Sequence, residues 1–131
     1  MADERVVLVV EDDTDLRSMY RSWLSDDYTV EVAGDVNEAR ETFHDGVDIA
    51  LLDRNLPGGD GSMLAGEFRS RNADCRLMVL TAVEPELAAL ELDVDAYLVK
   101  PVRRAQLLDA VRALERDDLA ALGEIEQIRL W

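Results

Sequence analysis

Acidic side chains, one threonine and one lysine follow four short apolar runs of this chain. They are Glu11, Asp12 and Asp13 after "RVVLVV", Asp53 after "VDIALL", Thr81 after "RLMVL" and Lys100 after "AYLV". Converging carboxylates raise each other's pKa unless a cation joins them. Oxygen ligands without His or Cys select a hard ion, and a few carboxylates completed by water suit Mg²⁺ better than Ca²⁺. If the fold brings these residues together, they predict a magnesium site.

Asp53 closes a continuous hydrophobic run directly before the turn sequence "LPGGDG". A carboxylate in this position can attack a phosphoryl group and form an aspartyl phosphate. The loose transition state of that transfer spreads negative charge over the phosphoryl oxygens, so the protein must supply positive charge and donors. Lys100 offers a compact positive charge, and the Thr81 hydroxyl can donate a hydrogen bond.

Lys100 is the chain's single lysine, since the other basic residues are arginines. An ammonium group can approach one phosphoryl oxygen where the broad guanidinium plane does not fit. This favours a functional lysine over an incidental surface lysine. Pro101, which follows, permits a cis peptide bond that would help to aim the side chain.

Structural explanations compete with these assignments. Asp13 is interpreted as a helix N-cap or an outer-shell residue. For Glu11 and Asp12 taken alone, a solvated acidic turn and a metal site both stay open. Asp53 could be an ordinary strand-to-loop aspartate, but its position opposite the first acidic cluster favours function. His44, the only histidine, is explained by a solvated helix C-terminus.

Strand-like and helix-like segments alternate along the chain. Strands are predicted at Arg5–Val10, Tyr28–Ala33, Val47–Leu52, Arg76–Leu80 and Ala96–Val99, and helices at Thr14–Asp26, Asp35–His44, Ser62–Arg71, 85–90 and Arg103–Arg116. This alternation predicts an α/β fold, a doubly wound parallel sheet with helices on both faces. Ligands bind such sheets beyond the carboxyl ends of the strands, which is where the chemical residues fall.

Composition limits the partners and the environment. The 131 residues predict one domain, and 29 acidic against 14 basic residues give a net charge of −15. That charge argues against nucleic acid or an anionic membrane as a direct partner. With its near absence of lysine, the composition resembles proteins of salt-loving organisms; the alternative is an ordinary acidic domain with an arginine preference. A lone Cys75 and the lack of a signal peptide or membrane span predict a cytoplasmic protein.

Four motifs carry a family resemblance: "VVLVVEDD", "LLDRNLPGGDG", "VLTA" and "AYLVKP". In this order they resemble the CheY-like receiver domain of two-component response regulators. The resemblance implies a flavodoxin-like, five-stranded parallel sheet of strand order 2-1-3-4-5. It also implies that Asp53 accepts phosphate from a histidine kinase and that Lys100 and Thr81 assist. The implied Mg²⁺ ligands are Asp12, Asp53, Glu11 through water, and the backbone carbonyl of Asn55, while Thr81 and Tyr97 resemble the switch pair.

Residues 1–116 are predicted to form the receiver and residues 117–131 a helical extension, or a linker to an output domain. Leu119, Leu122, Ile125 and Ile128 could form an apolar stripe in that tail. The resemblance predicts a switch that catalyses only its own phosphorylation and dephosphorylation, with self-association or an output protein as further partners. The alternatives are a Mg²⁺-dependent phosphohydrolase and an interaction module that works without phosphate.

Overall fold

The computed structural model describes residues 5–57, 59–82 and 94–130. The strands are β1 (Val6–Val10), β2 (Thr29–Ala33), β3 (Val47–Asp53), β4 (Asn55–Leu56), β5 (Gly59–Asp60), β6 (Arg76–Thr81), β7 (Ala96–Val99) and β8 (Ile128–Arg129). The helices are α1 (Thr14–Leu24), α2 (Val36–Thr42), α3 (Leu64–Arg71), α4 (Arg104–Glu115) and α5 (Leu119–Gly123), with a 3₁₀ turn η1 (Gly61–Met63). The predicted helix at 85–90 lies outside the described residues.

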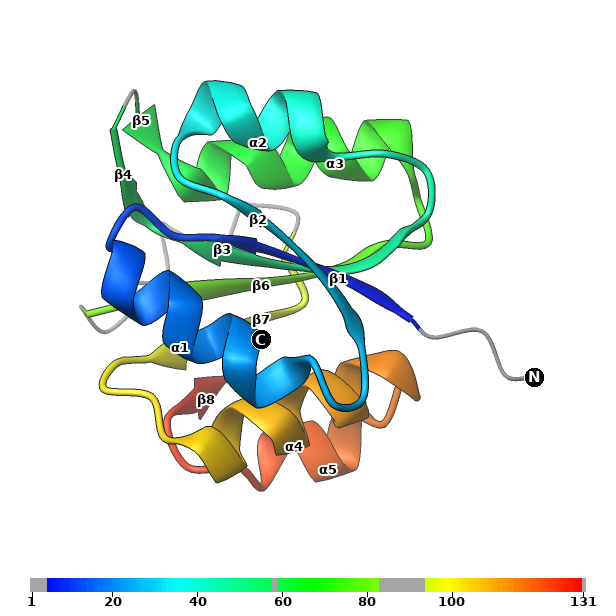
Figure 1. The fold of residues 1–131 in the computed structure, drawn as a ribbon. Helices are drawn as coiled ribbons and strands as arrows, with labels where there is room; N and C mark the ends of the chain where they lie inside the picture. Colours follow the sequence, from blue (N-terminus) through cyan, green and yellow to red (C-terminus); the bar gives the residue numbers. More distant parts are fainter. Residues whose placement is uncertain (1–4, 58, 83–93, 131) are drawn as a thin grey trace.

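A parallel sheet of order β2-β1-β3-β6-β7 forms the centre of the molecule. Helices α2 and α3 cover one face, and α1 and α4 cover the other (Figure 1). Each face has its own apolar core. Because both faces are covered, β1 and β3 are almost continuously apolar and buried. The predicted fold class and the order of the five parallel strands are confirmed.

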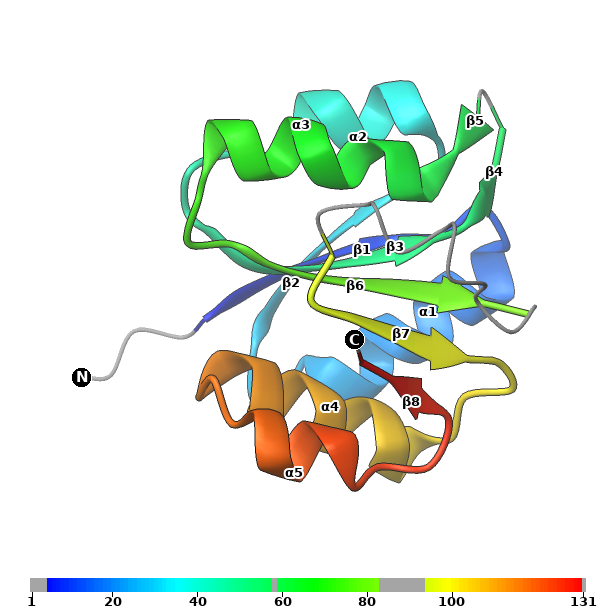
Figure 2. The same ribbon diagram turned by 180° about the vertical axis from the view of Figure 1, so that it is seen from behind.

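The prediction of five strands is wrong, because a sixth strand, β8, joins the main sheet. It runs antiparallel to β7 and pairs Ile128 with Leu98. Figure 2 shows how the tail reaches this edge: α5 packs beside α4, and the chain then turns back along β7. A separate two-stranded hairpin, β4–β5, follows β3. Local hydrophobic spacing could not reveal β8, since two residues carry no period.

Only some of the apolar residues predicted to form a stripe in the tail, residues 117–131, pack against the core. Leu122 and Ile128 are buried in the core and Ile125 packs against it, whereas Leu119 is 65% exposed. The stripe is therefore wrong for Leu119, because α5 ends at Gly123 and is too short to turn all four side chains inward.

Aspartate side chains cap the first two helices. Asp13 caps α1, as predicted, and Asp35 caps α2, each through its own side chain. The predicted helix boundaries differ from the observed ones by one or two residues, which is the usual uncertainty at helix ends. Within the described ranges, no helix is long and apolar enough to cross a membrane.

Candidate functional site

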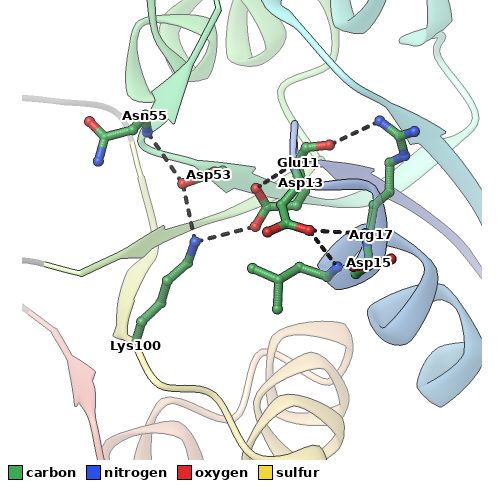
Figure 3. Close-up of polar contacts among 8 residues, drawn as sticks. Glu11, Asp13, Asp15, Arg17, Asp53, Asn55 and Lys100 are labelled. Atoms are coloured by element: carbon green, nitrogen blue, oxygen red, sulfur yellow. Dashed lines mark hydrogen bonds and ion pairs between the residues drawn. The ribbon is translucent and has the colours of Figure 1, made fainter.

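The carboxyl ends of four parallel strands meet at one rim of the sheet. They place Glu11 directly after β1, Asp53 and Thr81 as the last residues of β3 and β6, and Lys100 directly after β7. The Lys100 ammonium nitrogen lies 3.2 Å from Oε1 of Glu11 and 3.4 Å from Oδ1 of Asp53 (Figure 3). The structure thus brings together residues that 89 positions of sequence separate.

Asp53 is only 4% exposed, and the loop after it folds tightly back. The backbone N–H of Asn55 donates to Oδ1 of Asp53 over 3.3 Å. The N–H of Gly61 donates to the Arg54 carbonyl at 2.9 Å. A Cβ atom on Gly61 would overlap the carbonyl oxygen of Asp53, so this close approach requires glycine. Gly61 therefore packs directly against the backbone of Asp53.

Lys100 is fixed by its backbone as well as by its charge. Its N–H donates to the Thr81 carbonyl at 2.7 Å, and the Lys100–Pro101 peptide bond is cis. Burial disfavours the charged ammonium, but the negative charges of Asp53 and Glu11 outweigh it and raise the pKa of Lys100 above its ordinary value. Lys100 therefore stays positively charged beside Asp53.

Glu11 has the most strongly perturbed carboxyl group of the site. It is 1% exposed, and burial, followed by the neighbouring Asp53, raises its pKa to about 8. Asp12, the next residue, is exposed, and carboxylate oxygens of Glu11, Asp12 and Asp53 lie within 4.8 Å of one another. Three carboxyl groups lie beside one ammonium, so ionisation of Glu11 leaves the cluster with unbalanced negative charge. An oxygen-only donor set of this kind fits a hard divalent cation.

Asp13 takes the capping role rather than a place in the cluster. Its Oδ1 accepts from the N–H groups of Asp15 at 2.9 Å and Leu16 at 3.1 Å, which confirms the predicted N-cap. His44 lies at the end of α2, where its Nε2 contacts Glu31 at 2.7 Å.

Thr81 and Tyr97 lie on neighbouring strands and on the same face of the sheet. Tyr97 pairs with Val79, and Thr81 with Val99, two residues further along each strand. Tyr97 is 4% exposed and belongs to the apolar core on the face of the sheet that α2 and α3 cover.

Sequence reasoning missed one residue of the rim, Arg17. Its guanidinium donates from Nη1 to the backbone carbonyl of Glu11 at 3.1 Å (Figure 3). Arg17 lies four residues after the N-cap, on the face of α1 that also carries Asp13. That spacing does not indicate a bond to the Glu11 carbonyl, so the sequence held no signal for this contact.

Residues 7–112 match the response regulator receiver domain. The chain belongs to this family. The receiver is 44% identical over 114 residues to a regulator from Haloferax volcanii, which agrees with the halophilic character predicted from composition. It is 34% identical to the regulatory protein VanRB of Enterococcus faecalis and 40% identical to the response regulator MprA of Mycobacterium ulcerans. These alignments cover 86%, 95% and 88% of this chain, which spans 20%, 58% and 54% of the three relatives' length.

Solved structures agree with the receiver fold. A CheY-like receiver from Methanospirillum hungatei superposes with a TM-score of 0.80 at 24% identity, covering 90% of this chain and 99% of that one. The response regulator TrrA of Thermotoga maritima has a TM-score of 0.72 at 30% identity, covering 84% of this chain and 98% of its own. The receiver is thus a unit of two-component signalling, with an acidic cluster that fits a phosphorylation and metal site.

Proposed function

We propose that this receiver accepts one phosphoryl group on Asp53 from a histidine kinase, in a reaction that needs Mg²⁺. One observation carries the proposal: the Lys100 ammonium bridges Asp53 and the acidic pair that begins with Glu11. An aspartate at a strand end has many possible roles. An aspartate held 3.4 Å from the half-buried ammonium of the chain's single lysine, beside further carboxyl groups, has few.

The reaction follows from the positions of the side chains. A carboxylate oxygen of Asp53 attacks the phosphorus, and the bond from phosphorus to the histidine nitrogen breaks with its electron pair leaving on that nitrogen. Negative charge then spreads over the phosphoryl oxygens, where the Lys100 ammonium and the Thr81 hydroxyl stabilise it. Because the Lys100 ammonium already lies 3.4 Å from Oδ1 of Asp53, little reorganisation accompanies the transfer.

Glu11, Asp12 and Asp53 would hold the Mg²⁺ ion, together with the backbone carbonyl of Asn55. When bound, the ion supplies positive charge that neutralises the carboxylates and the phosphoryl oxygens. TrrA, 30% identical to this chain, has been crystallised in complex with Mg²⁺ and beryllium fluoride, which supports the assignment.

Output is proposed to pass through Thr81 and Tyr97. A phosphoryl group on Asp53 would draw the Thr81 hydroxyl towards it, and the buried Tyr97 ring on the adjacent strand would repack against the space that Thr81 leaves. The receiver would catalyse only its own phosphorylation and dephosphorylation, and it would act through self-association, an output domain or an output protein. Its net charge of −15 argues against direct contact with DNA by this segment.

Intact-mass spectrometry tests the proposal. The protein is incubated with acetyl phosphate in high salt, with and without Mg²⁺, beside the variant Asp53→Asn. The expected result is one added phosphoryl group that requires Mg²⁺ and is absent in the variant. Folded protein that binds Mg²⁺ but gains no mass would point to a phosphate-independent module. Sustained hydrolysis of p-nitrophenyl phosphate would point instead to a phosphohydrolase.

A further inference from the structure

The backbone of Glu11 is held from two sides at the point where β1 becomes the acidic loop. Its N–H donates to the Ala33 carbonyl at 3.0 Å, which continues the pairing of β1 with β2. Its carbonyl accepts from Nη1 of Arg17 at 3.1 Å. That carbonyl belongs to the peptide group that joins Glu11 to Asp12. The hydrogen bond from Arg17 therefore fixes the plane from which the Asp12 side chain departs.

Gly34, directly after β2, makes the space in which the Arg17 guanidinium lies. A Cβ atom at this position would stand 2.5 Å from Nη1 of Arg17 and 3.7 Å from its Cζ. Among the residues that the structure describes, no other atom beyond the two chain neighbours would meet it within 4 Å. Gly34 does not have the positive φ that favours glycine, so its backbone would accept alanine. An added methyl group would thus displace one flexible group, the guanidinium, and leave the backbone in place.

Gly34 itself is held by its surroundings. Its N–H donates to Oε1 of Glu38 at 2.9 Å, and the Glu38 N–H donates to Oδ1 of Asp35 at 2.7 Å. Asp35 thus caps α2, and the Glu38 side chain reaches back to the residue before the cap. The Arg17 guanidinium therefore packs against the β2–α2 turn at Gly34. The hydrogen bonds of this turn limit how far its backbone can shift.

We propose that Arg17, seated against Gly34, is a positioning residue of the metal site: it orients the Glu11–Asp12 peptide so that the acidic pair is preorganised for Mg²⁺. The inference deepens the proposed function and rests on it for the identity of the ion. Arg17 touches neither the ion nor the phosphoryl group in this role. Removing a residue that hydrogen-bonds to a metal ligand without contacting the ion typically lowers metal affinity by about 10- to 100-fold.

A double-mutant cycle tests the inference, with the Mg²⁺ dissociation constant measured by calorimetry on the full chain. Arg17→Met is expected to weaken Mg²⁺ binding by about tenfold or more. Gly34→Ala is expected to weaken it in the same direction, because the methyl group displaces the guanidinium. The double variant should bind no more weakly than Arg17→Met alone, because both changes remove the same contact. Arg17→Lys, which keeps a charged donor, should recover part of the affinity.

Arg21→Met is the matched control. Arg21 lies one turn further along α1, is exposed, and carries the same charge, so the variant changes net charge equally without touching Glu11. Equal weakening by Arg17→Met and Arg21→Met would reduce the effect to net charge and overturn the inference. Lowered stability of Arg17→Met in urea with an unchanged dissociation constant would overturn it too, because the role would then be structural.

The two proposals fail in different ways. A chain that binds Mg²⁺ but takes up no phosphoryl group would overturn the proposed function. The double-mutant cycle would still test the role of Arg17, because it measures Mg²⁺ binding alone. A chain that is phosphorylated, with all variants binding Mg²⁺ alike, would overturn only the role of Arg17. Additive effects of Gly34→Ala and Arg17→Met would likewise break the link between the two residues.

Discussion

The ammonium nitrogen of Lys100 lies 3.4 Å from Oδ1 of Asp53, although 47 positions separate the two residues. The contact depends on β7 lying next to β6, and β6 next to β3, in one parallel sheet. Asp53 is the last residue of β3, and Lys100 directly follows β7. The spacing and register of the strands therefore set the distance between the two side chains. The chain has 14 basic residues and a single lysine, and that lysine makes this contact.

Replacement of Lys100 tests whether the compact charge is needed. Lys100→Met is expected to slow phosphorylation by acetyl phosphate about a hundredfold, the usual cost of losing one group that stabilises transition-state charge. Lys100→Arg should recover little of the rate, because the planar guanidinium is broader than the ammonium group. A mass-spectrometric time course at saturating Mg²⁺ measures both rates. Arg104 is an exposed arginine at the start of α4, and Arg104→Met is the control that should react at the normal rate. A Lys100→Arg variant as fast as the parent chain would contradict the argument.

Glu11 predicts how Mg²⁺ binding depends on pH. Its pKa is raised to about 8, so below that pH the folded, metal-free protein keeps a proton that the ion must displace. Affinity should rise by up to about tenfold per pH unit between pH 6 and pH 8 and level off above. Glu11→Gln should flatten this dependence, and calorimetry in buffers of different ionisation enthalpy should detect the released proton. An affinity constant across this range would contradict the buried, proton-binding state of Glu11.

The raised pKa of Glu11 also predicts how the stability of the Mg²⁺-free protein depends on pH. A carboxyl whose folded pKa is raised holds its proton more tightly in the folded state than in the unfolded state. The free energy of unfolding should therefore fall as pH rises from about 4.5 to about 8, and then stay constant. Urea unfolding in EDTA measures the slope, and saturating Mg²⁺ should reduce it, because the bound ion stabilises the charged form.

Much of this site could be predicted because its residues stand at strand ends. The apolar runs marked the five parallel strands, and the residue after each run is placed at the rim by any doubly wound sheet. The position of Asp53 and Lys100 at this rim was predicted in this way, and the structure confirms it. The capping role of Asp13 followed from residue type and position alone.

Arg17 and β8 could not be predicted for physical reasons. The bond from Arg17 to Glu11 depends on the rotation of α1 against the sheet and on an absent side chain at Gly34, which no pattern in the sequence encodes. Strand β8 has two residues, and its pairing with β7 is set by the docking of Leu122 and Ile128 in the core. Both are tertiary effects that local periodicity does not carry.

Salt should stabilise the receiver. The net charge of −15 favours expansion through self-repulsion, and dissolved ions screen that repulsion as the Debye length falls from about 10 Å at 0.1 M to about 3 Å at 1 M. Thermal unfolding in increasing NaCl should show the melting temperature rising most steeply below about 0.5 M. A gain of about 1 kcal/mol corresponds to roughly 4 °C for a chain of this length. Sucrose, which carries no charge, is the control, and a melting temperature independent of low salt would contradict the prediction.

The tail offers a matched pair of variants. Ile128 is buried in the core beside β7, whereas Leu119 in the same tail is 65% exposed. Ile128→Ala should lower the free energy of unfolding by about 2–4 kcal/mol, and Leu119→Ala should change it by less than about 0.5 kcal/mol. Urea denaturation of both variants measures the difference.

Ile128→Ala should also affect self-association, because the tail covers the outer edge of β7. The Val99 N–H donates to the Gln127 carbonyl at 2.9 Å, and Gln106 on α4 donates from Nε2 to the Glu126 carbonyl at 3.1 Å. A loosened tail would uncover the outer edge of β7, and an uncovered strand edge pairs readily with other chains. Ile128→Ala should therefore self-associate more than Leu119→Ala in sedimentation velocity at matched concentrations. Equal stability and equal sedimentation of the two variants would mean that the tail does not dock on β7 in solution.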